Sequence, residues 1–370
     1  CVELVRKLIE THGIPSVFTA AACDTYGSAN ELSIGSVGAL GCSRAGNFAL
    51  QNCDLLLSIG SRLGSGTTGT DLPAFAREAR IVVLDLDDQE HQKPSVDIDR
   101  MLVGDLPTML SKILELQLSL DINEWQHKCQ QWKRAFPALL LERSKEDPVD
   151  LYSLSAALSD ELSTDAVLVT DSGLIELILP TNMAFSNSQR SIHPASQGAM
   201  GYALPASVGV ALSTSGEVLV VVGDGSVMMN LQELQTISHL ELPIKILIVN
   251  NGVYAIIRRR QSELFKGRTI GTDSGNGVSC PDFERVAETF GMHYFRINSE
   301  SELDELLGAF LSSEGPAICE VMGKPDQEYV RVAHAVLANR KHVLRPLEDQ
   351  APFLDRDFIL AEMIIDPHNL

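Results

Sequence analysis

The chain is poor in aromatic residues and in positive charge, and both shortages restrict what it can do. Only 5% of its residues are aromatic, and 29 Lys and Arg stand against 49 Asp and Glu, for a formal net charge of −20. A negative surplus of this size repels the phosphates of nucleic acids and the surfaces of anionic membranes. We therefore expect neither a nucleic acid nor a membrane as a partner, and any anionic ligand must be bound by local groups.

The chain also lacks cysteine pairs at metal-binding spacing and long apolar runs. Its seven cysteines include no C-x-x-C pair, and their odd number argues against a disulfide framework. The longest apolar runs have the length of a strand, far below the roughly 20 residues of a membrane-spanning helix, and no basic-then-apolar leader opens the chain. These features favour a cytoplasmic protein. Because the chain starts with Cys1 inside a helical pattern, we interpret it as part of a longer protein.

The order of apolar segments predicts an α/β fold of two Rossmann-like domains, each a parallel sheet flanked by helices. Helical and strand-like patterns alternate through residues 1–120 and again through residues 151–325. Such alternation produces parallel sheets with crossover helices. Between the two domains, residues 121–150 are polar and predict a helical linker. Residues 326–370 lose the periodic pattern and predict an extended C-terminal arm.

The stretch from Leu219 to Asn251 predicts a strand, a turn, a helix and a second strand. Its two apolar runs are rich in β-branched residues, as buried parallel strands are. The first run ends in Gly223-Asp224-Gly225-Ser226, where the glycines leave room for a charged ligand and Ser226 can cap the helix. The second ends at Asn250-Asn251. Asp224 and the asparagines are therefore expected at one edge of the sheet, where open α/β sheets bind ligands.

Carboxylate and amide oxygens of low total charge suit Mg²⁺, which completes its coordination with water and ligand phosphates. The Gly-Asp-Gly turn, the 24 residues after it and the Asn pair resemble the thiamin-diphosphate motif of the pyruvate decarboxylase and acetolactate synthase superfamily. The resemblance implies thiamin diphosphate and Mg²⁺ as cofactors, with Asp224, Asn251 and the Val253 carbonyl as metal ligands. Gly223, Gly225 and Ser226 are the expected diphosphate contacts on this side.

A second turn follows the strand expected at residues 166–170. Its residues Ser172 and Gly173 can supply hydroxyl and amide donors to a diphosphate. In acetolactate synthases a Gln-His pair follows this turn and contacts the diphosphate, whereas Leu174 and Ile175 stand in those places here. The sequence therefore departs from the family on this side of the site.

The segment Gly198-Ala199-Met200-Gly201 leads into a helix that begins near Pro205. It is similar to the family segment that holds the aminopyrimidine ring. The resemblance implies that the Gly198 carbonyl accepts a hydrogen bond from the pyrimidine amino group, that the Met200 amide and side chain lie beside the ring, and that the Met200 side chain supports the bent conformation of the cofactor. Ala199 is a further cofactor-binding residue that the resemblance implies. Without this context Met200 would be interpreted as a core residue, because methionine fills gaps in cores.

Three consecutive arginines, Arg258 to Arg260, follow the asparagine pair. Arg260 aligns with a tryptophan that selects the acceptor in acetolactate synthases. An arginine binds carboxylates and phosphates through paired hydrogen bonds, so the departure implies an anionic acceptor. The alternative is a solvated helix face, which is the usual role of a charge run.

The first domain contains a Gly-Ser-Gly-Thr-Thr-Gly run at residues 64–69 that has the letters of a dinucleotide-binding motif. Four residues separate it from the preceding strand and Pro73 interrupts the next helix, so a flexible loop is the preferred interpretation and a dinucleotide site the alternative. Most of residues 1–115 resemble the central domain of acetolactate synthase-like enzymes, which holds FAD in some members. Gly66 stands where the FAD-binding members have a second arginine, and FAD is therefore not expected.

The resemblance predicts a thiamin-diphosphate-dependent transferase or lyase that decarboxylates a 2-ketoacid such as pyruvate and joins the acyl unit to an acceptor. A simple 2-ketoacid decarboxylase and a non-catalytic thiamin-diphosphate-binding subunit are the alternatives. In the family the catalytic glutamate lies in an N-terminal pyrimidine domain of the partner subunit, and no segment here resembles that domain. We therefore expect a homodimer or homotetramer, and we expect these 370 residues alone to be inactive.

Overall fold

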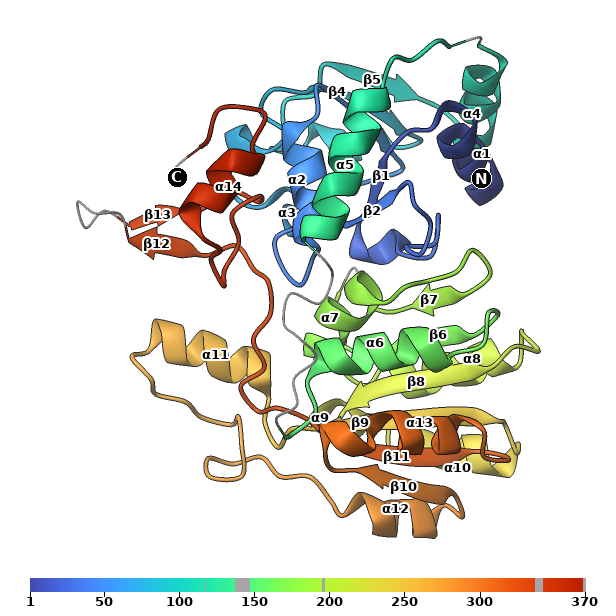
Figure 1. The fold of residues 1–370 in the computed structure, drawn as a ribbon. Coiled ribbons are helices and arrows are strands. Elements are labelled where there is room, and N and C mark those ends of the chain that lie inside the picture. The colour runs from blue at the N-terminus through green and yellow to red at the C-terminus, as the bar shows by residue number, and fades with distance from the viewer. Residues whose placement is uncertain (117, 137–146, 195–196, 337–341, 369–370) are drawn as a thin grey trace. The chain divides into compact units, whose positions relative to one another are not determined.

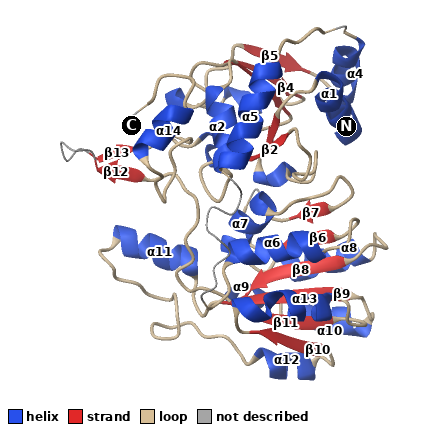
Figure 2. Cartoon of the chain, in the orientation of Figure 1, coloured by secondary structure: helices blue, strands red, loops and turns tan. Residues whose placement is uncertain are grey.

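The computed structural model describes residues 1–116, 118–136, 147–194, 197–336 and 342–368. It divides into two compact units, of which unit 1 comprises Cys1–Leu140 and Glu328–Leu370 and unit 2 comprises Leu141–Gln327. Both units contain parallel strands flanked by helices (Figure 1), and Figure 2 shows the alternation of helix and strand along the chain. The predicted α/β class is confirmed.

Unit 2 is built on a six-stranded sheet in which every neighbouring pair is parallel. The strand order is β10-β11-β9-β8-β6-β7. The strands are β6 (Val167–Thr170), β7 (Arg190–Ile192), β8 (Val218–Gly223), β9 (Ile244–Asn250), β10 (His293–Ile297) and β11 (Ala317–Met322). Because β8 and β9 are neighbours, with Gly223 opposite Val249, the Gly-Asp-Gly turn and the Asn pair leave the sheet at the same edge, as predicted.

Helices cover both faces of this sheet, which explains why its central strands are mostly apolar. One face packs on α8 (Ala203–Ala211), α10 (Glu233–His239) and α12 (Phe283–Thr289), whose apolar residues form one core cluster with β6, β8 and β9. The helices α6 (Leu151–Glu161), α7 (Leu174–Asn182) and α13 (Leu303–Leu311) pack beside one another and on the sheet. Successive residues of a strand point to opposite faces, so a strand buried on both faces has no polar side.

The helix expected after β8 is interrupted. A single turn, α9 (Asp224–Val227), is separated from α10 by residues 228–232. In this break Asn230 donates a hydrogen bond from Nδ2 to the Gly201 carbonyl at 2.8 Å, a partner that a continuous helix would not reach. Ser226 therefore lies inside α9 and does not cap it, since the N-cap position is Gly223.

Unit 1 contains two small parallel sheets. The larger has the order β3-β4-β5, and the smaller pairs β1 with β2. Leu8 and Leu110 pack on one face of the larger sheet around Leu84. The elements up to residue 115 are α1 (Val2–His12), β1 (Ser16–Phe18), β2 (Ser33–Ser36), α2 (Arg44–Asn52), β3 (Leu55–Ile59), α3 (Ser65–Thr68), β4 (Arg80–Asp85), β5 (Arg100–Val103) and α4 (Leu106–Glu115).

Two segments of unit 1 differ from the sequence-based expectation. The expected helical linker 121–150 does contain a helix, α5 (Asn123–Ala135), but its Trp132 is fully buried with its ring 5.8 Å from that of Phe48 in α2. Burial of this face makes α5 part of the unit 1 core, and residues 137–146 of the expected linker lie outside the described residues. The Gly-Thr run at residues 64–69 is not a flexible loop, because it forms the turn α3 and the Gly66 carbonyl accepts from the Ala39 N–H at 2.9 Å.

The C-terminal segment also packs within unit 1 and is not an extended arm. It contains β12 (His334–Val336) paired antiparallel with β13 (His342–Leu344), and the helix α14 (Arg356–Glu362). Between them, buried Gln350 accepts from Asn47 at 2.9 Å and buried Glu348 accepts from Gln51 at 2.8 Å, both on α2. These buried polar partners fix a segment that has no apolar periodicity. Within the part of the chain that the structure describes, no helix combines the length and apolar character required to cross a membrane.

Candidate functional site

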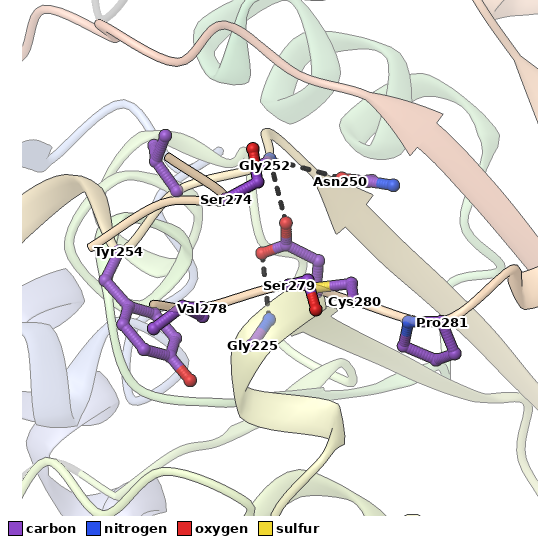
Figure 3. A pocket seen from close by; sticks show the side chains of 11 residues that line it. Gly225, Asn250, Gly252, Tyr254, Ser274, Val278, Ser279, Cys280 and Pro281 are labelled. Atoms are coloured by element: carbon purple, nitrogen blue, oxygen red, sulfur yellow. Dashed lines mark hydrogen bonds between the residues drawn. The ribbon is translucent and has the colours of Figure 1, made fainter. Parts of the chain in front are cut away.

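Asp224 is a buried carboxylate at the end of β8 and only 4% of the residue is exposed. Its Oδ1 accepts from the Gly225 N–H and its Oδ2 from the Gly252 N–H, both at 2.8 Å (Figure 3). Burial raises the pKa of Asp224, although the two backbone hydrogen bonds act in the opposite direction. Among the described residues, none of the ion pairs neutralises this carboxylate.

Asp224 borders a cavity of about 230 Å³ that lies within unit 2. The turn after β8 contributes Gly225, the last residue of β9 is Asn250, and the turn after β9 contributes Gly252, Val253 and Tyr254. A loop before α12, residues 274–281, supplies the remaining lining residues (Figure 3). The cavity therefore lies at the carboxyl edge of the sheet, where ligands of open α/β sheets bind.

The turn after β9 is held by the side chains of both asparagines. Asn250 Oδ1 accepts from the Gly252 N–H at 3.2 Å, and Asn251 Oδ1 accepts from the Val253 N–H at 3.1 Å. Of the expected metal ligands, the structure brings Asp224 and Val253 to the cavity. Asn251 is not one of its lining residues, whereas Asn250, which was expected at this sheet edge but not as a metal ligand, is.

The donor set of this cavity fits a hard divalent cation. A buried carboxylate without a cationic partner is costly, and Mg²⁺ supplies charge to such a group while accepting neutral oxygen donors for its other positions. The part of the chain that is described holds no cluster of three or more His, Cys, Asp or Glu side chains suited to a metal. A metal at Asp224 would therefore rely on amide and carbonyl oxygens and on ligand phosphates.

Gly225 is required for a reason that the sequence did not reveal. A Cβ atom there would lie 1.9 Å from Cε1 of Tyr254, so the Tyr254 ring and not a ligand occupies the space beside Gly225. At Gly223, in contrast, a Cβ atom would meet no atom within 4 Å. Gly225 therefore leaves room for the Tyr254 ring, whereas the space beside the Gly223 backbone is open, although Gly225 and not Gly223 lines the cavity.

The loop before α12 is the main part of the site that sequence reasoning missed. Asn276 organises it, because its Oδ1 accepts from the N–H groups of Thr272 and Asp273 at 2.6 and 3.1 Å. The Thr272 carbonyl in turn accepts from the Tyr254 N–H at 2.8 Å, which joins the loop to the turn after β9. Cys280 lies beside Asp224, and burial with the nearby carboxylate raises the pKa of its thiol to about 12. The Gly and Asn residues of this loop are typical of turns and carry no sign of a binding site.

A fully buried carboxylate, Asp171, joins two further segments that were expected to bind cofactor. Its Oδ1 accepts from the Gly201 N–H at 3.0 Å and its Oδ2 from the Ala203 N–H at 2.8 Å. These two hydrogen bonds fix the segment after residue 197 against the turn after β6. The two segments lie close together, since a Cβ atom on Gly198 would be 3.6 Å from Ser172 Oγ. Sequence reasoning named the neighbours of Asp171 and missed the residue that holds them.

The other expected cofactor residues lie around this junction. Gly173 precedes α7, and Ala199 and Met200 are exposed, Met200 to 39%. Met200 is therefore not a core residue. Leu174 and Ile175 are buried and unable to contact a ligand as a Gln-His pair would.

Arg260 lies on α11 (Ala255–Leu264), and the structure does not bring it to the cavity. Its side chain is 69% exposed and its closest acidic partner is Glu263, at 3.9 Å. Arg258 differs, because it forms an ion pair with Asp326 and donates to the Pro325 carbonyl at 3.1 Å. Within the part of the chain that the structure describes, the guanidinium of Arg260 thus has one weak ion pair and otherwise faces solvent.

Comparison with known proteins assigns both units of the chain. Residues 1–113 match the family model for the thiamine pyrophosphate enzyme central domain, and residues 171–321 match that for the C-terminal TPP binding domain of thiamine pyrophosphate enzymes. Thiamine pyrophosphate (TPP) is another name for thiamin diphosphate.

Three curated relatives illustrate the extent of the similarity. The acetolactate synthase large subunit of Porphyra purpurea is 29% identical over 86% of this chain and 54% of its own length. The acetolactate synthase isozyme 2 large subunit of Escherichia coli (strain K12) is 30% identical over 86% of this chain and 57% of its own length. The acetolactate synthase large subunit of Corynebacterium glutamicum is 30% identical over 99% of this chain and 59% of its own length. The chain thus spans little more than half the length of these relatives. It belongs to the thiamine pyrophosphate enzyme family, of which it carries the central domain and the C-terminal TPP-binding domain.

Proposed function

We propose that the protein uses thiamin diphosphate and Mg²⁺ to decarboxylate a 2-ketoacid, pyruvate or a similar one, and to join the acyl unit to an acceptor. The observation that carries the proposal is the Asp224 carboxylate. It is buried at the end of β8, its oxygens are fixed by two backbone N–H groups, and it borders a cavity in the unit that matches the TPP-binding domain.

Asp224, the Asn251 side chain and the Val253 carbonyl would hold the metal ion. Together they offer one negative charge and two neutral oxygens, a set that leaves room for phosphate oxygens and water around Mg²⁺. The amide and hydroxyl groups of Gly223 and Ser226 would then contact the diphosphate. Among the described residues, Asp224 is the one acidic side chain that lines the cavity, which supports an ion that arrives with an anionic cofactor.

Ser172 and Gly173 would bind the same diphosphate from the turn after β6. Asp171 would act through the backbone, because its bonds to the Gly201 and Ala203 N–H groups hold the segment whose Gly198 carbonyl and Met200 side chain would contact the pyrimidine. When bound, thiamin diphosphate supplies a nucleophilic carbon that attacks the ketone of a 2-ketoacid and accepts the electrons released with CO₂.

The catalytic glutamate and the subunit arrangement are further parts of the proposal. By the resemblance to acetolactate synthases, the glutamate belongs to a pyrimidine-binding domain of a partner subunit, and a homodimer or homotetramer completes the site. The relatives are about twice as long as the matched region, which is compatible with a further domain in the complete protein. We also propose a cytoplasmic location, and an anionic acceptor that Arg260 contacts.

Calorimetric titration of the full-length protein with thiamin diphosphate, with and without Mg²⁺, tests the proposal. We expect binding that depends on Mg²⁺ and is lost in Asp224→Ala, and the variant Asp224→Asn keeps the side-chain size while removing the charge. Binding of equal affinity in all three proteins would refute the metal assignment. Incubation with ¹³C-pyruvate then separates the reactions, because a joined product supports carboligation and acetaldehyde alone indicates a simple decarboxylase.

A further inference from the structure

Another buried carboxylate of unit 2, Glu320, lies on the strand next to β9 and has no role in the proposed function. It belongs to β11, which pairs with β9 on one side and β10 on the other, and its side chain is 6% exposed. A buried carboxylate reduces stability unless polar partners surround it. The hydrogen-bond partners of Glu320 therefore indicate the role of this buried carboxylate.

Glu320 connects the edge strand β10 to the turn after β9. Its Oε1 accepts from Asn250 Nδ2 at 2.6 Å. Its Oε2 accepts from the Tyr294 hydroxyl and lies 3.6 Å from Arg296 Nη1. Burial and the bond to Glu320 raise the pKa of Tyr294, so the hydroxyl keeps its proton and remains a donor.

These partners fix the orientation of the Asn250 amide. The Glu320 oxygen accepts from Nδ2 and the Gly252 N–H can only donate, so Asn250 directs Nδ2 to Glu320 and Oδ1 to Gly252. The same Gly252 N–H donates to Asp224 Oδ2 at 2.8 Å. A continuous set of hydrogen bonds thus leads from Glu320 through Asn250 and Gly252 to the carboxylate at the cavity.

We infer that Glu320 is a positioning residue, which fixes Asn250 and through it the Gly252–Val253 backbone that must face Asp224 for Mg²⁺ and diphosphate to bind. The inference rests on the proposed function, since it concerns the same metal site. Glu320 is not a catalytic residue, because Asn250 and the turn after β9 separate it from the cavity. Glu320 acts by keeping the Val253 carbonyl oxygen and the Asp224 carboxylate at a fixed separation before the metal ion and the cofactor bind.

The test compares variants of Glu320 that retain or remove its acceptor. Glu320→Leu leaves Asn250 Nδ2 without its acceptor, and we expect the Mg²⁺ affinity measured calorimetrically at saturating thiamin diphosphate to fall at least about tenfold. Glu320→Gln can still accept from Asn250 through its amide oxygen and should stay within about threefold of the parent protein. Tyr294→Phe is the matched control, because it removes a bond on the far side of Glu320 and should lower the thermal stability more than the Mg²⁺ affinity.

A double-mutant cycle with Asn250→Ala distinguishes positioning from a general structural role. If Glu320 acts through Asn250, the losses in Mg²⁺ affinity for Glu320→Leu and Asn250→Ala are not additive. Additive losses, or unchanged affinity in Asn250→Ala, would overturn the inference, and the latter measurement stands even if Glu320→Leu does not fold. Absence of Mg²⁺-dependent binding in the parent protein would instead refute the proposed function together with this inference.

Discussion

The ring of Tyr254 lies against Gly225, so closely that a Cβ atom on Gly225 would be 1.9 Å from the ring carbon Cε1. Gly225 follows β8 and Tyr254 follows β9, and both residues line the cavity. The contact holds the two turns together at the point where Asp224 accepts from Gly252. One glycine of the Gly-Asp-Gly motif therefore serves packing within the protein.

Alanine substitutions at Gly225 and Gly223 should have different consequences. Gly225→Ala forces the Tyr254 ring to move, and overpacking of this kind reduces the free energy of unfolding by about 1–3 kcal/mol. Gly223 has a φ of −75° and open space around the added Cβ, so Gly223→Ala should keep the stability and weaken only thiamin diphosphate binding. Urea denaturation with calorimetric titration measures both effects. Equal stability of the two variants would contradict this account of Gly225.

Asp171 should be among the most sensitive positions of unit 2. Its carboxylate is fully buried and accepts from three backbone N–H groups, those of Ser172, Gly201 and Ala203. Removal of a buried acceptor costs about 1–3 kcal/mol for each group left unpaired, so Asp171→Ala should lower the free energy of unfolding by more than about 2 kcal/mol. The control is Asp165→Ala, at an exposed aspartate before β6, which should change it by less than about 0.5 kcal/mol. Similar losses of unfolding free energy in both variants would show that the buried hydrogen bonds of Asp171 do not stabilise unit 2.

The elements around the site could be predicted because their signals are local. The β-branched runs of β8 and β9 and the polar residues that end them placed Asp224 and the asparagines at one sheet edge, as the pairing of Gly223 with Val249 bears out. The missed features depend on residues distant in the sequence. Asn250 and Glu320 are 70 positions apart, and only the sheet order brings β11 beside β9.

The errors have the same physical origin. The α5 segment has a polar composition that suggested a linker, yet Trp132 and Cys129 suffice to bury one side of it. The break after α9 follows from the bond between Asn230 and Gly201, which helical periodicity alone does not encode. Where the local helix propensity was weak, tertiary contacts of single side chains thus determined the local structure.

Most cysteines should be unreactive in the native protein. Cys42, Cys53, Cys129 and Cys319 are buried, and burial raises the pKa of each thiol from 9.0 to about 12. At pH 8 their thiolate content is then roughly a thousandfold below that of an ordinary thiol, and it increases only as the pH approaches 12. Iodoacetamide labelling read by mass spectrometry should modify exposed Cys1 first and these four after denaturation. Labelling of Cys319 at the rate of Cys1 would show that the core opens in solution.

The last prediction concerns Arg260 and the acceptor. Its guanidinium is largely exposed and its only ion pair among the described residues, to Glu263 at 3.9 Å, is of the weak surface kind, so it remains available to an anion. Arg260→Trp should leave the free energy of unfolding within about 0.5 kcal/mol of the parent value. It should lower kcat/KM for an anionic acceptor roughly 10- to 100-fold, about 1.4 to 2.7 kcal/mol, with little change in the decarboxylation of the donor.

Steady-state kinetics on both half-reactions, with Arg258→Ala as the control, decides the role of Arg260. Arg258 is engaged by Asp326 and the Pro325 carbonyl, so its loss should affect stability more than the choice of acceptor. A loss confined to the acceptor step in Arg260→Trp supports contact with the acceptor, because folding and cofactor defects reduce both half-reactions together. No loss in either half-reaction would make Arg260 a solvated residue of α11, and the anionic acceptor would then require another cation.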